Sequence, residues 1–331
     1  MKVQIAGAGE TVIDASRYCV MEHYQEMERF LLECGQGKKG EVVLYKVCRD
    51  GAVSRQKFYY DGTDMYLSTA RVTWRGKSTP VISDVTHMEI ETWNYTEKGW
   101  FCYELSVPKP PEVTEIVDGS CMVRVRPLSN ECLAWSEKCV LPLGYQGNNL
   151  LCSNWDAAHM EGLDYNAIYE YLYAMKYRER FEPENSSFSG INEEKYFTQV
   201  DVGGASNYRI PAAEFEGLLM EYLPVTAEQL RRWAVFDEES QTYAWARMGC
   251  MNVSPTVFST SLPEVVRVEE NGDGTITLTV DAVCDMTMCN DAVITHQLMI
   301  RCREDGSFQY LGNQILNDGV LNIPEYQYRL R

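Results

Sequence analysis

The sequence predicts an α+β protein of two domains, each a mostly antiparallel, curved sheet packed by one or two helices. Three observations lead to this class. Apolar and polar residues alternate in both halves of the chain, Asp-Gly turn sequences separate the alternating runs, and two stretches carry apolar residues at spacings of three and four. Side chains alternate across a strand and recur about every 3.6 residues on a helix, so these patterns indicate hairpins and amphipathic helices.

The N-terminal third predicts one helix followed by a meander. Apolar residues recur through 13–34, and Gly35 supplies the helix stop. Turns that contain glycine then separate five alternating runs, which we expect to be strands at 41–49, 52–60, 64–74, 85–95 and 100–107.

The middle of the chain predicts a short helix at 130–138 and a longer one at 164–180, which Asp164 caps. Tyrosine recurs at every fourth position of the longer helix. The stretch that follows is rich in Pro, Asn, Ser and Glu, which is typical of a linker. We therefore expect a first domain at 1–181, a linker at 182–195 and a second domain at 196–331.

The second domain is expected to open with a strand near 196–202. Pro211 and Thr226 mark the starts of two helices that end near Tyr222 and Trp233. A strand at 241–250 is expected to pair with a four-stranded meander, whose runs are 264–270, 275–284, 293–303 and 307–315. By analogy, this helix-then-strand order is that of cystatin-like or nuclear-transport-factor-like folds.

Charge limits the partners of this chain. The formal net charge is −18, and from Glu182 onward there are 23 acidic and 10 basic residues. Phosphate backbones and anionic lipids attract clustered Lys and Arg, so we do not expect a nucleic-acid partner. No apolar run is long enough for a transmembrane segment, and the first residues lack the apolar core of a signal peptide.

Twelve cysteines leave two locations open. In one hypothesis most thiols are free and buried, in a cytoplasmic protein of an anaerobe. In the other, favoured hypothesis the protein is extracytoplasmic, at the cell surface or secreted, with a signal peptide or lipid anchor upstream and with disulfides. Cys284 and Cys289 flank one connection and are the candidate disulfide.

Catalytic signatures are missing from the sequence. There is no Gly-x-Ser-x-Gly elbow, no phosphate-binding loop and no His-Glu-x-x-His zinc motif. Ser54 and Lys57 match Ser-x-x-Lys, but they fall in a predicted strand and lack the companion motifs. We therefore assign no catalytic residue, no metal ligand and no cofactor.

Aromatic residues are the best binding candidates, because aromatic surfaces bind sugars and apolar ligands. The alternative is that the tyrosine-bearing helix packs these rings against a sheet, with hydroxyl groups reaching solvent. The candidate binding residues are Tyr165, Tyr169, Tyr173, Trp93, Trp100 and Trp155.

Two resemblances concern the bacterial envelope. The leading helix and the Lys-Phe-Tyr-Tyr-Asp-Gly-Thr-Asp-Met-Tyr-Leu sequence at 57–67 resemble half-barrel lipoprotein carriers, over residues 14–105. The sequences at 144–150, 155–156, 273–281 and 305–308 are similar to uncharacterised secreted lipoproteins of anaerobic Gram-positive bacteria, over most of the chain. This second resemblance implies an envelope location and no known activity.

The leading hypothesis is a non-enzymatic, extracytoplasmic protein that binds a ligand or a protein partner, with a carrier of apolar ligands as its first variant. A second hypothesis is a hydrolase with a site at the domain junction, around His87, His159 and Trp155-Asp156. A third is a structural subunit that pairs with another chain through strand edges.

Overall fold

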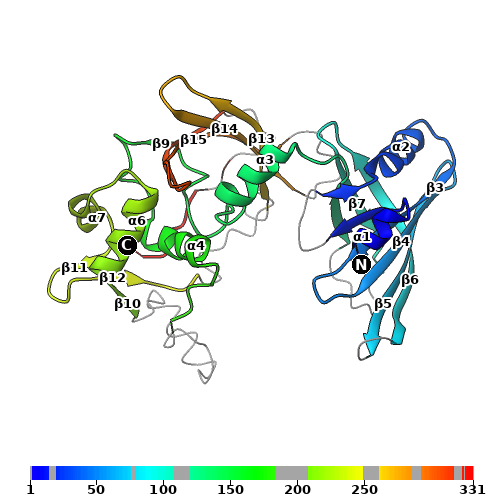
Figure 1. Cartoon of the computed structure of the whole chain (residues 1–331), viewed down its shortest axis with the longest axis horizontal. Coiled ribbons are helices and arrows are strands. Elements are labelled where there is room, and N and C mark those ends of the chain that lie inside the picture. The colour runs from blue at the N-terminus through cyan, green and yellow to red at the C-terminus, as the bar shows by residue number, and fades with distance from the viewer. Residues whose placement is uncertain are drawn as a thin grey trace. The chain divides into compact units, whose positions relative to one another are not determined.

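The protein folds into two compact units, each built on curved, mostly antiparallel sheets (Figure 1). This computed structural model describes residues 2–14, 20–75, 79–107, 119–183, 208–248, 261–284, 292–316, 323 and 325–330. The first unit spans Met1–Ser129, and the second spans Asn130–Cys284 and Ala292–Arg331. The expected α+β class is therefore confirmed.

The first unit contains an eight-stranded sheet in the order β2-β1-β3-β4-β5-β6-β7-β8. Neighbouring strands are antiparallel except β1 and β3, which are parallel. The elements are α1 (Lys2–Gly7), β1 (Thr11–Asp14), β2 (Met21–Glu22), α2 (Tyr24–Cys34), β3 (Gly40–Val47), β4 (Val53–Tyr60), β5 (Met65–Arg75), β6 (Thr79–Tyr95), β7 (Trp100–Leu105) and β8 (Ser120–Arg124).

Helix α2 fills one face of this sheet with side chains. Met27 and Leu31 of the helix pack with Leu44, Phe58 and Phe101 in one buried cluster. Phe58 and Phe101 meet edge to face, with ring centroids 5.5 Å apart. Because this face is packed with aromatic and aliphatic side chains, the structure offers no support for a carrier cavity between α2 and the sheet.

Glu28 fixes α2 to the sheet. Its Oε1 accepts hydrogen bonds from Tyr95 Oη at 2.7 Å and from Arg126 Nη2 at 2.7 Å. Burial raises the pKa of Glu28, but the hydrogen bonds from Tyr95 and Arg126 outweigh this effect and lower it.

The expected helix at 13–34 is shorter than predicted. Only Tyr24–Cys34 is helical, while Thr11–Asp14 forms β1 beside β3; residues 15–19 lie outside the described part. Val12 and Ile13 are β-branched, and Val12 is fully buried in the sheet. Strand pairing with β3 therefore overrides the helical periodicity here.

The second unit contains a five-stranded sheet in the order β13-β14-β15-β16-β9 and a three-stranded sheet in the order β10-β12-β11. Its elements are α3 (Asn130–Trp135), a π-helical turn (Ser136–Val140), β9 (Trp155–Asp156), α4 (Tyr165–Tyr177), β10 (Tyr208–Pro211), α6 (Ala212–Tyr222), α7 (Ala227–Trp233), β11 (Phe236–Asp237), β12 (Thr242–Trp245), β13 (Leu262–Glu270), β14 (Thr275–Val283), β15 (Thr295–Cys302) and β16 (Phe308–Ile315).

Two predicted helix caps are confirmed in this unit. Asp164 Oδ1 accepts a hydrogen bond from Ala167 N at 3.1 Å at the start of α4. Thr226 and Gln229 form a reciprocal capping box at the start of α7. The C-terminal meander is also confirmed, as β13 to β16.

The first unit ends at Ser129. The sequence had instead predicted a domain boundary at a linker spanning 182–195. Helix α4 was expected to close the first domain, but it packs within the second unit. The Tyr169 ring stacks on Phe215 of α6 at 5.2 Å, and Asn166 Nδ2 donates to Ala244 O at 2.6 Å. These partners lie far along the chain, so local composition could not reveal them; the expected strand at 196–202 lies outside the described residues.

The expected pairing of 241–250 with the meander is wrong. Strand β12 pairs instead with β10 and β11 in the small sheet. The fifth strand of the meander sheet is β9, which pairs with β16. An alternating sequence specifies a strand without specifying its neighbour, and here chain connectivity and packing on α4 and α6 decide it.

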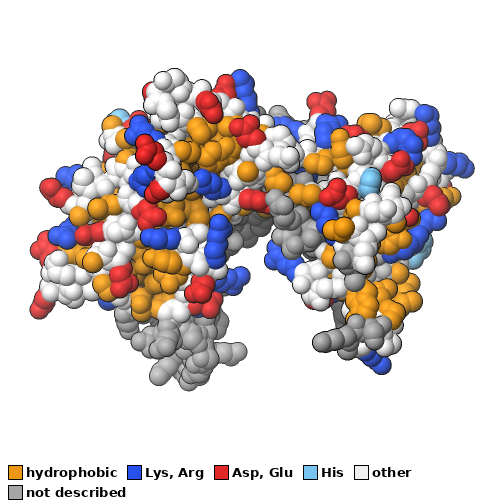
Figure 2. Space-filling view, viewed as in Figure 1, with side chains coloured by type: hydrophobic (Ala, Val, Ile, Leu, Met, Phe, Trp, Pro, Cys, Tyr) orange, Lys and Arg blue, Asp and Glu red, His pale blue; other side chains and the backbone are white. Residues whose placement is uncertain are grey.

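Charged residues are unevenly distributed along the chain. Residues 1–129 include 18 acidic and 16 basic residues, whereas residues 130–331 include 30 and 14. Figure 2 shows hydrophobic side chains gathered over the far end of the β5–β6 hairpin. Within the described residues, no helix is long and apolar enough to cross a membrane.

Candidate ligand-binding groove

A groove of about 470 Å³ lies on the five-stranded sheet of the second unit, at its β9 edge. This volume is within the range of small-ligand sites. Residues from four strands and from the turn after β9 line it: Asn154, Trp155, Asp156, His159, Thr277, Gln297, Met299, Leu311, Gly312, Asn313 and Gln314.

Strand alternation places the lining side chains. On β15, His296 and Leu298 are buried while Gln297 and Met299 point to the opposite face. Gln314 of β16 lies directly opposite Gln297, and Thr277 of β14 lies opposite Met299. The two carboxamides thus lie on opposed residues of neighbouring strands, and Met299 lies next to them on the same face.

Strand β9 approaches β16 closely at Gly312. A Cβ atom at this position would lie 3.0 Å from the carbonyl oxygen of Trp155. Trp155 is buried, and its Nε1 donates to Leu150 O at 2.8 Å. The hydrogen bond fixes the indole to the segment before β9, and the absence of a side chain at Gly312 permits the close approach of β9 and β16.

Asp156 and His159 form a dyad at the rim. Asp156 Oδ1 accepts hydrogen bonds from Ala158 N at 2.8 Å, His159 N at 3.0 Å and His159 Nδ1 at 3.0 Å. The bond from Ala158, followed by those from His159, lowers the pKa of Asp156. The carboxylate orients the imidazole and leaves Nε2 for a ligand, and the two side chains are 64% and 74% exposed.

A buried polar network supports the groove from beneath. Asn313 Nδ2 donates to Leu151 O at 3.1 Å and Ser153 O at 2.9 Å, so its Oδ1 accepts from His296 Nδ1 at 2.6 Å. His296 Nε2 then accepts from Tyr145 Oη at 2.9 Å. Burial lowers the pKa of His296 to about 4, which keeps the ring neutral and makes it a structural residue.

The groove combines the carboxamides of Gln297 and Gln314 and the carboxylate of Asp156 with the apolar side chains of Met299 and Leu311. None of its lining residues is Lys or Arg. A carboxamide carries a donor and an acceptor together, as a hydroxyl group does, so paired amides suit a neutral polar ligand. The lining does not favour an anionic ligand, because it offers no lysine or arginine to neutralise one.

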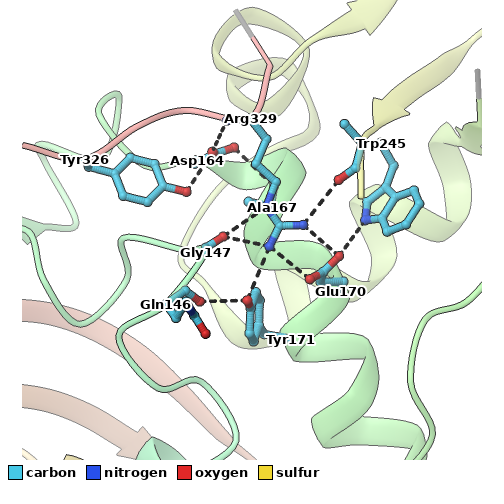
Figure 3. Close-up of polar contacts among 10 residues, drawn as sticks. Gln146, Gly147, Asp164, Ala167, Glu170, Tyr171, Trp245, Tyr326 and Arg329 are labelled. Carbon is cyan, nitrogen blue, oxygen red and sulfur yellow. Dashed lines mark hydrogen bonds and ion pairs between the residues drawn. The ribbon is translucent and has the colours of Figure 1, made fainter. Parts of the chain in front are cut away.

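A second polar cluster surrounds Arg329, whose side chain is 1% exposed (Figure 3). Arg329 Nη1 and Nη2 contact the two oxygens of Glu170 at 2.8 and 2.9 Å. The guanidinium also donates to Gly147 O at 2.8 Å and to Ala246 O at 3.2 Å.

The residues next to Arg329 complete this cluster. Asp164 Oδ2 accepts from Tyr326 Oη at 2.9 Å and from Arg329 N at 3.3 Å, and Trp245 Nε1 donates to Glu170 Oε2 at 2.9 Å. Figure 3 shows these groups directed at one another, from α4, β12 and the C-terminal segment. Each charge has a partner, so the cluster anchors the C-terminal segment to α4 and does not resemble a reactive centre.

The predicted binding residues fall in separate places, and only Trp155 lines the groove. Trp93 and Trp100 belong to the first unit, where Trp93 packs against Tyr60 and Phe101, and Arg124 stacks over Trp100 at 5.5 Å.

The tyrosines of α4 lie in the second unit and mostly face its interior. Tyr165 stacks on Trp233 at 6.1 Å and donates to Met160 O at 2.8 Å. Tyr169 is buried beside Phe215, and Tyr173 packs on Tyr169 and Phe181.

The histidines of the hydrolase hypothesis belong to different units. His87 lies on β6, where its ring stacks on Tyr66 at 5.8 Å and its Nδ1 is 2.8 Å from Ser68 Oγ. His159 lies in the second unit. Among the described residues, no group of three or more His, Cys, Asp or Glu side chains could hold a metal ion.

The candidate disulfide lies partly outside the described residues, because Cys289 belongs to 285–291. Cys284 is buried at the end of the β14 run. Elsewhere, burial raises the pKa of the Cys34 thiol to about 12, which keeps this group protonated and unreactive.

Gln297, Gln314 and Arg329 were not among the residues predicted to form a site. For Gln297 a signal existed, since the alternation placed it on the polar face of its strand. For Arg329 there was none, because its partners lie 83 to 182 residues away.

These features define an α+β protein of two units, with a polar groove on the sheet of the second. The chain belongs to a family of unknown function, DUF6070, whose model matches residues 1–329. No curated protein and no solved structure matches it.

Proposed function

We propose that this protein is a non-enzymatic binding protein whose ligand occupies the groove of the second unit. The observation that carries the proposal is the Gln297–Gln314 pair, which lies beside Met299 in a groove whose lining contains no Lys or Arg. The ligand that fits best is neutral and rich in hydroxyl groups, such as a short oligosaccharide. Its hydroxyls would bond the amides and Asp156, and its C–H faces would contact Met299 and Leu311.

Two stages of experiment test this proposal. The full chain is first screened on an array of neutral oligosaccharides, and any hit is measured by isothermal titration calorimetry. The double variant Gln297→Ala/Gln314→Ala is expected to weaken binding at least about tenfold, because it removes two hydrogen-bonding groups. Gln309→Ala is the matched control, since Gln309 is a glutamine of β16 that does not line the groove.

The outcomes separate the groove from other surfaces. Equal affinities of the double variant and the wild type would show that the ligand binds elsewhere. Failure of every neutral saccharide to bind would remove this ligand class.

A hydrolase is the second candidate function, and the Asp156–His159 dyad favours it. With Nδ1 bonded to the carboxylate, Nε2 could accept a proton from a water that attacks a bound ester or glycoside. Panels of such substrates test this idea. Turnover that is lost in His159→Ala and in Asp156→Asn would replace the binding function with a catalytic one.

We also propose an extracytoplasmic location, which the resemblance to secreted lipoproteins supports. Fractionation of the native cells with an antibody to the protein tests it. Recovery in the cytoplasmic fraction alone would contradict the proposal.

A further inference from the structure

The far end of the β5–β6 hairpin extends beyond the neighbouring strands. Strands β5 and β6 pair as far as Arg75 opposite Thr79. Strand β4 pairs with β5 only up to Val72, and β7 pairs with β6 only from Ile90 onward. Among the described residues, the hairpin is therefore two strands wide beyond Val72. We call its far end, residues 70–75 and 79–85, the β5–β6 ribbon; β4 borders it as far as Val72.

One face of this ribbon is apolar over three cross-strand pairs. The pairs are Ala70–Val85, Val72–Ile82 and Trp74–Pro80. They share a face because Ala70, Val72 and Trp74 are alternate residues of β5 and each lies opposite its partner in β6. Ile82 is 65% and Val85 is 69% exposed. Figure 2 shows the resulting hydrophobic patch at this end of the first unit. Exposed apolar patches of this kind mark interaction sites.

Two cationic side chains flank the patch. Arg55 of β4 lies opposite Ala70 on the same face, and Arg75 ends β5 in an exposed position. Arg71 lies on the other face, where it pairs with Asp50. Most of the net charge of −18 lies outside the first unit, because residues 1–129 have a formal net charge of only −2.

We propose that the apolar face of the β5–β6 ribbon binds the surface of an anionic lipid bilayer. Val72, Trp74, Ile82 and Val85 would enter the headgroup boundary, and Arg55 and Arg75 would contact lipid phosphates. Side chains of these types, aromatic and aliphatic with flanking cations, are those that lie at membrane interfaces. This contact is independent of the groove in the second unit.

The geometry favours a bilayer over a second copy of the chain. A stable protein interface buries about 800 Å² on each partner, which is more than a narrow ribbon of three apolar pairs offers. Strand addition along β6 is also disfavoured. Pro80 lacks an N–H group, and the register shift between Arg71 and Val72 leaves Ser83 as an extra residue in β6. Such features block edge pairing.

Vesicle sedimentation of the full chain tests the proposal. We expect binding to vesicles of phosphatidylglycerol and phosphatidylcholine in equal amounts, with weaker binding to phosphatidylcholine alone and at high salt. The double variant Ile82→Asp/Val85→Asp is expected to lower the partition coefficient at least about tenfold, since it removes two apolar side chains and adds negative charge. Both positions are exposed, so the fold should persist, which circular dichroism checks.

Leu32→Asp is the matched control, because Leu32 is an exposed apolar residue on α2 of the same unit. It should leave the partition coefficient unchanged. Three results would overturn the proposal: no binding to the anionic vesicles, equal loss of binding in the control and the double variant, or concentration-dependent sedimentation of the wild type that the double variant abolishes. The last would assign the patch to a second copy of the chain.

Discussion

Arg329 and Glu170 form a bidentate ion pair that joins the C-terminal segment to α4 across 159 residues of sequence. The arginine is almost fully buried, and its donors reach Gly147 O and Ala246 O as well as the carboxylate. A buried charge in such a site is tolerated because its partners replace the water that it has lost. Arg329 is thus part of the core of the second unit.

We expect Arg329→Met to destabilise the second unit by about 3–5 kcal/mol, because it leaves Glu170 and two carbonyl groups without their partner. Chemical denaturation followed by tryptophan fluorescence measures this loss. Arg267→Met is the control, since Arg267 forms an exposed pair with Glu269, and it should cost about 1 kcal/mol or less. Equal effects of the two substitutions would show that the buried pair is not an anchor.

Gly147→Ala should disrupt the same cluster through sterics. Gly147 has φ of 73°, and a Cβ atom there would lie 2.6 Å from Tyr171 Oη and 2.8 Å from Arg329 Nη2. Both groups are fixed by hydrogen bonds and cannot move freely. Gly274→Ala isolates the backbone cost, because Gly274 has φ of 79° with no atom within 4 Å.

In denaturation experiments, Gly274→Ala should cost about 1–2 kcal/mol, the usual penalty for a left-handed alanine, and Gly147→Ala clearly more. If the two alanine variants unfold at the same denaturant concentration, the close contacts around Gly147 do not contribute to the free energy of unfolding.

His296 should make the stability of the second unit fall in mild acid. Its pKa is about 4 in the folded state and about 6.5 when unfolded, so the unfolded chain binds more protons between these values. The free energy of unfolding therefore rises with pH across this window, and His296 accounts for a loss of about 2 kcal/mol between pH 7 and pH 5.

The variant His296→Gln tests this origin, because glutamine can still accept from Tyr145 and donate to Asn313 but does not titrate. The free energy of unfolding, measured from pH 5 to pH 7, should change by about 2 kcal/mol less in the variant than in the wild type. Parallel curves would assign the acid sensitivity to other groups.

Ser136 completes the backbone hydrogen bonding of β13 from the π-helical turn. Its Oγ donates to Cys132 O at 2.8 Å and accepts from Val265 N at 2.9 Å, at the β13 irregularity between Val265 and Arg267. We expect Ser136→Ala to cost about 1–3 kcal/mol, because the buried Val265 N–H loses its acceptor. Thermal unfolding measures the loss of stability. The control Ser240→Ala, at an exposed position, should change the stability little. If Ser136→Ala also leaves the stability unchanged, water or a backbone shift replaces the hydroxyl.

The local elements of this protein can be read directly from its amino-acid sequence. Period-two alternation between Asp-Gly turns specified the hairpins from β13 to β16, and Asp164 and Thr226 specified two helix starts. These signals are readable because their physical causes, the pleat of a strand and the free N–H groups of a first helical turn, act within a few residues.

Tertiary packing selected which of these elements contact one another. It assigned α4 to the second unit, gave β12 the partners β10 and β11, and brought Asp156 and His159 to the sheet that carries Gln297 and Gln314. It also buried Arg329 against Glu170. These outcomes depend on packing between residues distant in sequence, where many pairings satisfy the same local pattern and only burial and hydrogen-bond satisfaction in three dimensions select one.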